Sequence, residues 1–236
     1  MRRALFLLAS IAAPAVAQDT APPGALTVGG GAAVVSDYRF RGVSQTSRRP
    51  AVQANATVTH RSGVYASAWA STVSDDVANG ADAELDLIAG YSRTFASGVK
   101  VDGGVTWYVF PGGRGGNFVE PYLSVSATYG PVTGKVSASY APSQRALGHD
   151  DSLYLAGDLS AGVPTTPLTL TAHLGRNLGP DRLLLTRGYT DWSLGAAAVF
   201  RRVTVGVSYV DTDRVVRRRG RNLSDAGVVA SVGVSF

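Results

Sequence analysis

The 236-residue chain contains no cysteine, a single methionine and, beyond its first twenty residues, no long run of apolar side chains. The lack of cysteine excludes disulfide bonds, thiolate metal sites and a thiol nucleophile. The lack of an apolar stretch of about 18 residues excludes a transmembrane helix. No segment shows a 3.6-residue periodicity. What the chain has instead is abundant glycine, alanine, valine and serine, arranged with a recurring two-residue alternation.

The N-terminus has the organisation of a secretory signal peptide. Arg2 and Arg3 precede a ten-residue apolar run, and an A-x-A cleavage site ends at Ala17. The run is too short to span a bilayer, which takes about 20 apolar residues. We therefore expect residues 1–17 to be removed and residues 18–236 to be exported. Without the two arginines the formal net charge falls from +5 to +3. Such a mild balance, on an exported chain, argues against a nucleic-acid partner.

Twelve segments alternate apolar and polar side chains, so each would have one apolar and one polar face as a strand. In the penultimate segment, for example, Val203, Val205 and Val207 oppose Thr204 and Ser208. The segments are 25–43, 50–61, 63–73, 83–95, 99–110, 118–129, 132–140, 152–161, 167–175, 189–200, 202–210 and 226–236.

The connections between these segments alternate in length. RSG at 61–63, ASG at 96–98 and RR at 201–202 are short, whereas SQTSRR, PGGRGGN and DTDRVVRRRGRNLSD are long and rich in glycine or charge. A soluble β-sandwich also alternates, but it has no reason to sort its connections by length. Outer-membrane barrels have short periplasmic turns, long extracellular loops and an even strand number. We therefore predict an all-β fold, a transmembrane antiparallel up-and-down β-barrel of about twelve strands.

The segment SDYRFRG at 36–42 alternates charges with aromatic rings. As the outer end of the first strand, it would place Tyr38 and Phe40 in a lipid-facing girdle and Asp37, Arg39 and Arg41 in the lumen. An arginine facing lipid at the midplane would cost roughly 2–4 kcal/mol, so strict alternation is expected at this boundary. Two arginines near the mouth would raise the local concentration of anions.

Several motifs resemble one family. VVSDYRFRGVSQTSRRPAVQANATVTHRSGVYASAWAS, then AELDLIAGYSRTF, VTWYVFPGG, FVEPYLSVSATYG, LTLTAHLGRN, YTDWSLGAA and VSYVDTD, are similar to the TorF-type porin family of Gram-negative outer membranes. The resemblance covers nearly the whole mature chain and implies an outer-membrane barrel that forms a pore. Likeness to such barrels also implies that Phe236 is a signal for the barrel assembly machinery; the alternative is an ordinary strand end. The basic loop DTDRVVRRRGRNLSD shows least of the family pattern.

The polar face of the predicted strands gives a candidate pore lining. Its members are Asp37, Arg39, Arg41, Glu84, Asp86, Lys100, Asp102, Glu120, Lys135, Asp158, His173 and Arg201. Five of them are basic and six are acidic, with one histidine besides. The near balance predicts a wall of ion pairs and hydrogen bonds, and no filter of one sign. A barrel of twelve strands is also narrow enough for long side chains to plug it.

No constellation indicates catalysis, a cofactor or a metal. No local motif places a serine and a third group beside His173, while His60 lies at a predicted periplasmic turn and His149 in a predicted outer loop. Glu84 and Asp86 share a face as a glycosidase pair could, but a wet barrel wall lacks the apolar surroundings such a pair needs. GGRGGN opens no helix, and DTD lacks the glycine and glutamate of a calcium loop. We expect no enzyme.

The sequence thus predicts a monomeric porin of the bacterial outer membrane for small hydrophilic solutes or ions. The alternative is a non-conducting barrel that binds a partner or supports the envelope. The expected partners are membrane lipid and lipopolysaccharide, the latter through loop arginines that could equally be solvated charge, together with periplasmic chaperones and the assembly machinery during biogenesis.

Overall fold

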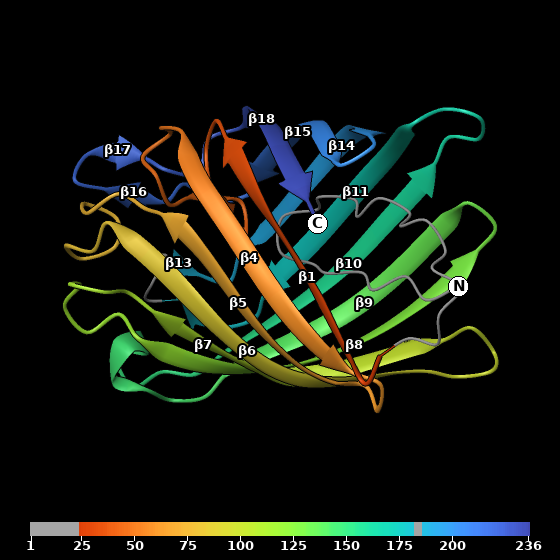
Figure 1. Cartoon of the computed structure of the whole chain (residues 1–236). Helices are drawn as coiled ribbons and strands as arrows, with labels where there is room; N and C mark the ends of the chain where they lie inside the picture. Colours follow the sequence, from red (N-terminus) through yellow and green to blue (C-terminus); the bar gives the residue numbers. More distant parts are fainter. Residues whose placement is uncertain (1–23, 182–185) are drawn as a thin grey trace.

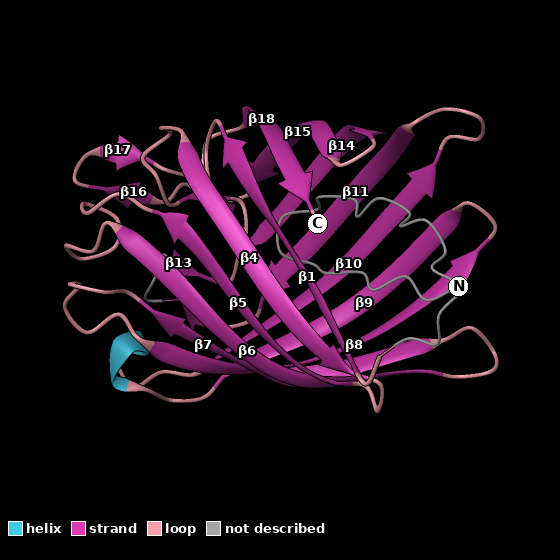
Figure 2. Cartoon of the chain, viewed as in Figure 1, coloured by secondary structure: helices cyan, strands magenta, loops and turns pink. Residues whose placement is uncertain are grey.

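A computed structural model describes residues 24–181 and 186–236. The chain closes on itself as an antiparallel barrel of twelve strands, strongly tilted around the barrel axis (Figure 1). Figure 2 shows that the regular structure is almost entirely strand, apart from one short 3-10 helix, η1 (Arg145–Leu147). The fold predicted from the alternation is therefore confirmed. The predicted signal peptide, residues 1–17, lies outside the described residues.

The barrel strands follow the predicted segments closely. They are β1 (Leu26–Val35), β4 (Ala51–His60), β5 (Val64–Thr72), β6 (Ala83–Thr94), β7 (Lys100–Val109), β8 (Phe118–Tyr129), β9 (Val132–Ala141), β10 (Ser152–Gly162), β11 (Leu168–Asn177), β14 (Thr190–Phe200), β15 (Val203–Thr212) and β18 (Gly227–Ser235). Three small hairpins lie between them: β2 (Arg39–Phe40) with β3 (Val43–Ser44), β12 (Pro180–Asp181) with β13 (Thr186–Arg187), and β16 (Arg217–Arg218) with β17 (Arg221–Asn222). The first predicted strand, 25–43, is thus too long, because β1 ends at Val35.

Strand β1 closes the barrel by pairing on both of its edges. It pairs with β4 from Leu26↔His60 to Val35↔Ala51, and with β18 from Gly31↔Ser235 to Val35↔Ser231. All other barrel strands pair with their neighbours in the chain, as an up-and-down topology requires. The closed ring leaves no barrel strand with an unpaired edge, which is the condition for strands to cross lipid.

The two faces of the barrel differ in polarity. On β4 the outward Val52 and Val58 are exposed, whereas the inward Gln53 and Thr57 are buried. On β7 the outward Trp107 is 46 % exposed between the buried Thr106 and Tyr108. The same alternation continues around the wall, so large apolar side chains cover the outside and polar side chains line the inside. A belt of this kind would be unfavourable in water and matches hydrocarbon.

The connections are sorted by length between the two ends. One end has the tight turns 61–63, 95–99, 130–131, 163–167 and 201–202. The other end has six long loops, which we call L1 (36–50), L2 (73–82), L3 (110–117), L4 (142–151), L5 (178–189) and L6 (213–226). In Figure 1 the long loops lie at the left and the tight turns at the right. No helix among the described residues is long and apolar enough to span a membrane.

The loop asymmetry predicts which end faces outward. In a chain without native cysteine, single cysteines can be introduced at Val215 and Arg114 on the long loops and at Ser62 and Ser97 on the tight turns, all of them exposed. We expect a membrane-impermeant maleimide to label Val215→Cys and Arg114→Cys on intact cells, because long loops face outward in such barrels. Ser62→Cys and Ser97→Cys should react only after lysis. Labelling of the turn variants on intact cells would reverse the topology.

The final residue joins the seam of the barrel. The Phe236 N–H donates to the Gly30 carbonyl, and the Gly30 N–H donates to the Phe236 carbonyl, both at 3.0 Å. The ring lies against Gly30, where an added Cβ would be only 2.9 Å from Phe236 Cζ. Phe236 therefore completes the pairing of β1 with β18 besides any role in recognition.

Deletion of Phe236 should lower the amount of folded barrel, because it removes two seam hydrogen bonds together with the aromatic ring. The measurement is the heat-modifiable band of the outer-membrane fraction on gels. Phe236→Ala, which keeps the backbone, separates the two contributions: a loss in both variants assigns the effect to the ring. Unchanged insertion after deletion would make Phe236 an ordinary strand end.

Candidate functional site: the lumen and its hairpin

The chain after β1 turns into the barrel instead of extending its wall. Strands β2 and β3 pair through Arg39↔Ser44 and Phe40↔Val43 and form what we call the L1 hairpin. Its two central residues, Arg41 and Gly42, have φ values of 49° and 82°, which is the backbone of a tight two-residue hairpin turn. Val43 and Ser44 are almost completely buried, so the hairpin lies inside the lumen at the long-loop end.

The predicted lipid-facing girdle at this point is wrong. Tyr38 is buried and its ring centroid lies 5.2 Å from that of Trp69, an inward residue of β5. Phe40 lies 5.8 Å from Tyr108, an inward residue of β7. Both rings therefore pack against the inner wall. The physical reason is the Arg41–Gly42 turn, which reverses the chain before the alternation can reach the outer rim.

The tip of the hairpin bridges two sides of the lumen. On one side, a side chain at Gly42 would overlap Thr212 of β15 and would come within 2.9 Å of Asp191 Cβ on β14. On the other side, Arg41 reaches Glu120 of β8. Only glycine fits this seat, because both the positive φ and the close approach exclude a Cβ.

Arg41 occupies a site built for a guanidinium group. Its Nη2 donates to Glu120 Oε1 at 2.8 Å and to Oε2 at 2.7 Å. Its Cζ lies 4.1 Å from the ring centroid of Tyr154 and 4.7 Å from that of Phe40. Tyr108 donates a further hydrogen bond to Glu120, at 3.2 Å. Removal of one partner from such a buried pair leaves an uncompensated charge and costs about 3–5 kcal/mol.

The other two charges of the segment hold the hairpin together. Arg39 Nε donates to Asp37 Oδ2 at 2.8 Å, while Ser44 and Thr46 donate to Asp37 Oδ1 at 2.5 Å and 3.0 Å. Arg39 also donates to the carbonyl of Asp225 in L6, at 2.7 Å. Asp37 and Arg39 therefore neutralise each other within L1. They do not form part of the strand wall.

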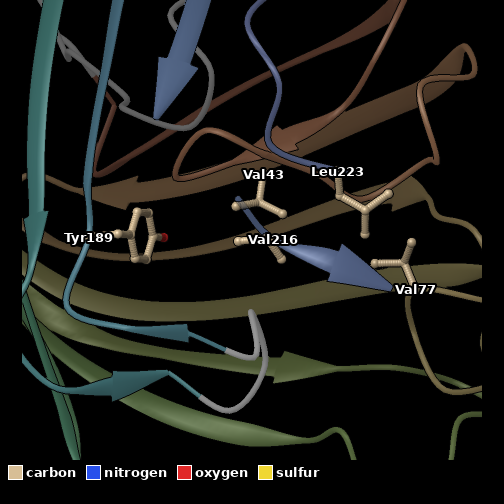
Figure 3. Close-up of a cluster of buried hydrophobic side chains, with 5 residues drawn as sticks. All are labelled: Val43, Val77, Tyr189, Val216 and Leu223. Carbon is tan, nitrogen blue, oxygen red and sulfur yellow. The ribbon is translucent and has the colours of Figure 1, made fainter. Parts of the chain in front are cut away.

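At the long-loop end, the hairpin and three other long loops share a small apolar core. Val43 of L1, Val77 of L2, Tyr189 of L5 and Val216 and Leu223 of L6 pack together (Figure 3). Backbone bonds join the same loops: the Ser44 N–H donates to the Leu223 carbonyl at 2.8 Å, and the Ser74 N–H donates to the Gln45 carbonyl at 2.9 Å. The loops thus form a lid over this end of the barrel. At its edge, the hydrogen bond from Arg48 lowers the pKa of the exposed Asp225 carboxyl.

The structure redistributes the predicted pore-lining residues. Eight of them point into the lumen from the strands: Glu84, Asp86, Lys100, Asp102, Glu120, Lys135, Asp158 and His173. Asp37, Arg39 and Arg41 lie in the lumen on the L1 hairpin. Arg201 is wrongly placed in the prediction, because it lies exposed in the turn between β14 and β15, where its φ is 58°. The predicted residues that remain on the strand wall are therefore five carboxylates against two lysines and one histidine.

Two carboxylates near the long-loop end of β6 stand out. Glu84 is 4 % exposed and Asp86 is 1 % exposed. Glu84 Oε2 and both carboxylate oxygens of Asp86 have no hydrogen-bond partner in the part of the chain that the structure describes. Buried polar atoms are nearly always paired, so three unpaired carboxylate oxygens on one strand require an explanation.

Deeper in the lumen, a polar network surrounds His173. Its Nδ1 lies 2.7 Å from Asp158 Oδ1, and its Nε2 lies 3.1 Å from Asp191 Oδ1. Tyr154 donates to Asp191 at 2.9 Å, and the Tyr154 hydroxyl lies 3.0 Å from His173 Nε2. Both ring nitrogens of the histidine therefore face acidic or phenolic groups.

A second network lies on the opposite wall. Tyr65 donates to Asp102 at 2.8 Å and is hydrogen-bonded to Tyr122. Lys100 lies 3.8 Å from Asp102. Asp191 and the tyrosines of both networks are absent from the predicted pore lining. The alternation could have found Asp191, because it shares its strand face with Ser193, opposite Trp192 and Leu194.

The comparisons with known proteins agree with this fold. The family described as "Bacterial protein of unknown function (Gcw_chp)" matches residues 19–236, and no curated protein shows significant similarity. An outer-membrane channel from Pseudomonas putida is similar over 94 % of this chain and 99 % of its own, with 12 % identity and a TM-score of 0.52.

Two further solved structures show a weaker likeness. The outer-membrane channel DcaP of Acinetobacter baumannii has 10 % identity and a TM-score of 0.48, over 89 % of this chain and 97 % of its own. OpdQ of Pseudomonas aeruginosa has 11 % identity and a TM-score of 0.47, over 90 % and 68 %. Similarity at such identities concerns the fold. The finer resemblance to TorF-type porins stays a prediction.

The close fit of Gly42 against the wall can be tested by replacing it with a residue that is too large for the space. Gly42→Val should undock the L1 hairpin, since valine at positive φ costs about 1–2 kcal/mol and the overlap with Thr212 and Asp191 adds about 1–3 kcal/mol. Each 1.4 kcal/mol raises the undocked population about tenfold. We therefore expect trypsin to cleave after Arg39 and Arg41 at least about tenfold faster, as measured by mass spectrometry.

The matched control is Gly220→Val in L6. Gly220 has a φ of 80°, close to that of Gly42, but an added Cβ there meets nothing within 4 Å. This variant carries the same backbone strain without the overlap and should leave Arg39 and Arg41 protected. Equal cleavage in both variants would mean that the close approach of Gly42 to Thr212 and Asp191 does not hold the hairpin in the lumen.

Proposed function

We propose that this chain, which belongs to the family of bacterial proteins of unknown function named Gcw_chp, is a monomeric channel of the bacterial outer membrane through which small hydrophilic solutes or ions diffuse. One observation carries the proposal: a closed ring of strands presents large apolar side chains outside and polar or charged side chains inside. Such a wall suits hydrocarbon on one face and water on the other. The likeness to a solved outer-membrane channel in fold is consistent with it.

The position of the L1 hairpin makes it the natural constriction of this channel. Below the hairpin, the wall between the His173 and Tyr65 networks carries small polar side chains such as Ser124, Ser137 and Ser160. Passage at the long-loop end requires the hairpin and the lid above it to shift. The hairpin meets the strand wall through the Arg41–Glu120 ion pair, the Tyr154 ring, the close approach of Gly42 and two ring contacts. It meets the other loops through Val43 and through hydrogen bonds of Arg39 and Ser44 to L6.

A second function has one observation in its favour. The apolar lid of Val43, Val77 and Leu223 is packed like a small core, which suits a barrel that stays closed and serves as a binding or structural element of the envelope. The two possibilities differ in whether the lumen ever conducts.

The remaining expectations belong to the same proposal. Exposed arginines of L1 and L6, among them Arg49, Arg217 and Arg219, would meet the phosphates of lipopolysaccharide at the outer surface. Periplasmic chaperones and the barrel assembly machinery would deliver and insert the chain.

Conductance distinguishes a channel from a closed barrel. Because the Gln45 N–H donates to the Tyr38 carbonyl at 2.7 Å, residues 39–44 can be replaced by two glycines without separating the ends of the hairpin. In planar bilayers we expect the shortened barrel to conduct steadily and the wild type to conduct less, since the hairpin fills the long-loop end of the lumen.

The control shortens L6 by the same amount outside the lumen. The Leu223 N–H donates to the Val216 carbonyl at 2.8 Å, so residues 217–222 can also be replaced by two glycines. This variant should conduct like the wild type. If neither the wild type nor the L1 variant conducts while both run as heat-modifiable barrels, the channel proposal fails and the closed barrel stands.

A further inference from the structure

The charges of the strand wall are segregated along the barrel. Glu84, Asp86, Glu120 and Asp191 all lie within the first four residues of their strands at the long-loop end. Among the described residues, no strand contributes a lysine or arginine to the lumen at this level, and the nearest histidine, His173, reaches only Asp191 of these four. Lys100, Lys135 and His173 lie deeper, together with Asp102 and Asp158. We call the four upper carboxylates the acidic ring.

The barrel wall supplies partners for Glu120 and Asp191, from Tyr108, Tyr154 and His173, but leaves the two carboxylates of β6 incompletely paired. Within the described part of the chain, Asp86 has no hydrogen-bond partner for either carboxylate oxygen, and Glu84 has none for Oε2, although both side chains are more than nine-tenths buried. Both project inward from β6 toward the space that the L1 hairpin occupies. Unpaired buried carboxylate oxygens point to a cationic partner that the wall does not supply.

The cation that contacts Glu120 belongs to L1. Arg41 forms the two-oxygen contact with Glu120 and lies over the Tyr154 ring, whose hydroxyl donates to Asp191. Its charge is not needed inside the hairpin, because Asp37 is already paired with Arg39. Arg41 thus sits in the ring as a ligand would, held by a carboxylate and by aromatic faces.

We propose that the acidic ring is a binding site for small organic cations with a guanidinium or primary ammonium group, which Arg41 occupies as a tethered ligand. An incoming cation would replace the guanidinium of Arg41 at Glu120 and Tyr154, so that Glu120 is not left unpaired as the hairpin leaves. The site also deepens the proposed function, on which this last part rests: the channel would pass such cations in preference to anions.

The geometry favours organic cations over metal ions. The described residues contain no group of three or more side chains placed to hold a metal ion. They do offer aromatic faces next to the carboxylates, from Tyr154 at Glu120 and from Tyr108, which is paired with Asp86 across the strands. Aromatic faces beside carboxylates suit a guanidinium or an ammonium group carried on an organic stem.

A tethered competitor gives the site a specific test. Its removal by Arg41→Gln should raise the affinity for methylguanidinium by about tenfold or more, because the intramolecular ligand no longer competes. Arg41→Lys keeps a competing cation, so this variant should bind methylguanidinium more weakly than Arg41→Gln does. In the Arg41→Gln background, Glu120→Gln should abolish the gain. Calorimetry on the detergent-solubilised, heat-modifiable barrel measures binding without any need for conduction.

Arg201→Gln is the control, since it removes an equal charge from an exposed turn outside the lumen. It should bind methylguanidinium like the wild type. The proposal is wrong if Arg41→Gln gains no affinity, if Glu120→Gln leaves the gain intact, or if acetate binds as well as methylguanidinium.

Reversal potentials in a potassium chloride gradient then separate the two proposals. We expect the barrel with the shortened L1 hairpin to prefer potassium over chloride, and the same barrel with Glu120→Gln to prefer it less. Methylguanidinium binding without conductance would retain the site and reject the channel. Conductance without cation preference and without methylguanidinium binding would retain the channel and reject the site.

Discussion

The structure depends on β1 hydrogen-bonding along both of its edges. Its pairing with β4 and with β18 turns a twelve-stranded meander into a ring, and only a ring leaves no backbone edge to be satisfied by water. Closure then imposes two faces on every strand. Side chains such as Val52 and Trp107 must lie outside, while Gln53 and Thr106 must lie inside. Small residues such as Ser137, Ser139 and Gly206 are frequent on the inner face, and they leave space in a narrow barrel for a hairpin.

That space is filled by a segment that carries its own polar partners. Asp37 accepts hydrogen bonds from Arg39, Ser44 and Thr46, so most of the charge on L1 is compensated before the hairpin meets the wall. The remaining contacts with the wall are the ion pair of Arg41 with Glu120, aromatic packing and the seat of Gly42. Because the hairpin carries its own polar partners, Arg41 and Glu120 are the charges left uncompensated when it leaves the lumen, and a displaceable constriction requires a partner for them.

The sequence predicts the barrel well and the L1 hairpin poorly, for one physical reason. Alternation is enforced by the difference between lipid and lumen, so it specifies β4 or β7 nearly to the residue. Inside the lumen no such difference exists, yet SDYRFRG still alternates, because Tyr38 and Phe40 pack on the inner wall while Asp37 and Arg39 pair with each other. The Arg41–Gly42 turn between Phe40 and Val43 was the available signal. Contacts such as Arg41 with Glu120 join residues distant in the chain, and periodicity carries no information about them.

Moving three charges from the wall to a hairpin changes the electrostatics of the whole lumen. Counted with the strands, Arg39 and Arg41 make the predicted wall nearly balanced; assigned to L1, they leave the described wall with Glu84, Asp86, Asp102, Glu120, Asp158 and Asp191 against Lys100, Lys135 and His173. The rim at the long-loop end carries exposed arginines such as Arg217 and Arg219. Without bound anions, these arginines would repel the cations that the acidic ring attracts. Bound to phosphate groups at the membrane surface, they would be neutralised, and the field at the mouth would then be set by the carboxylates below them.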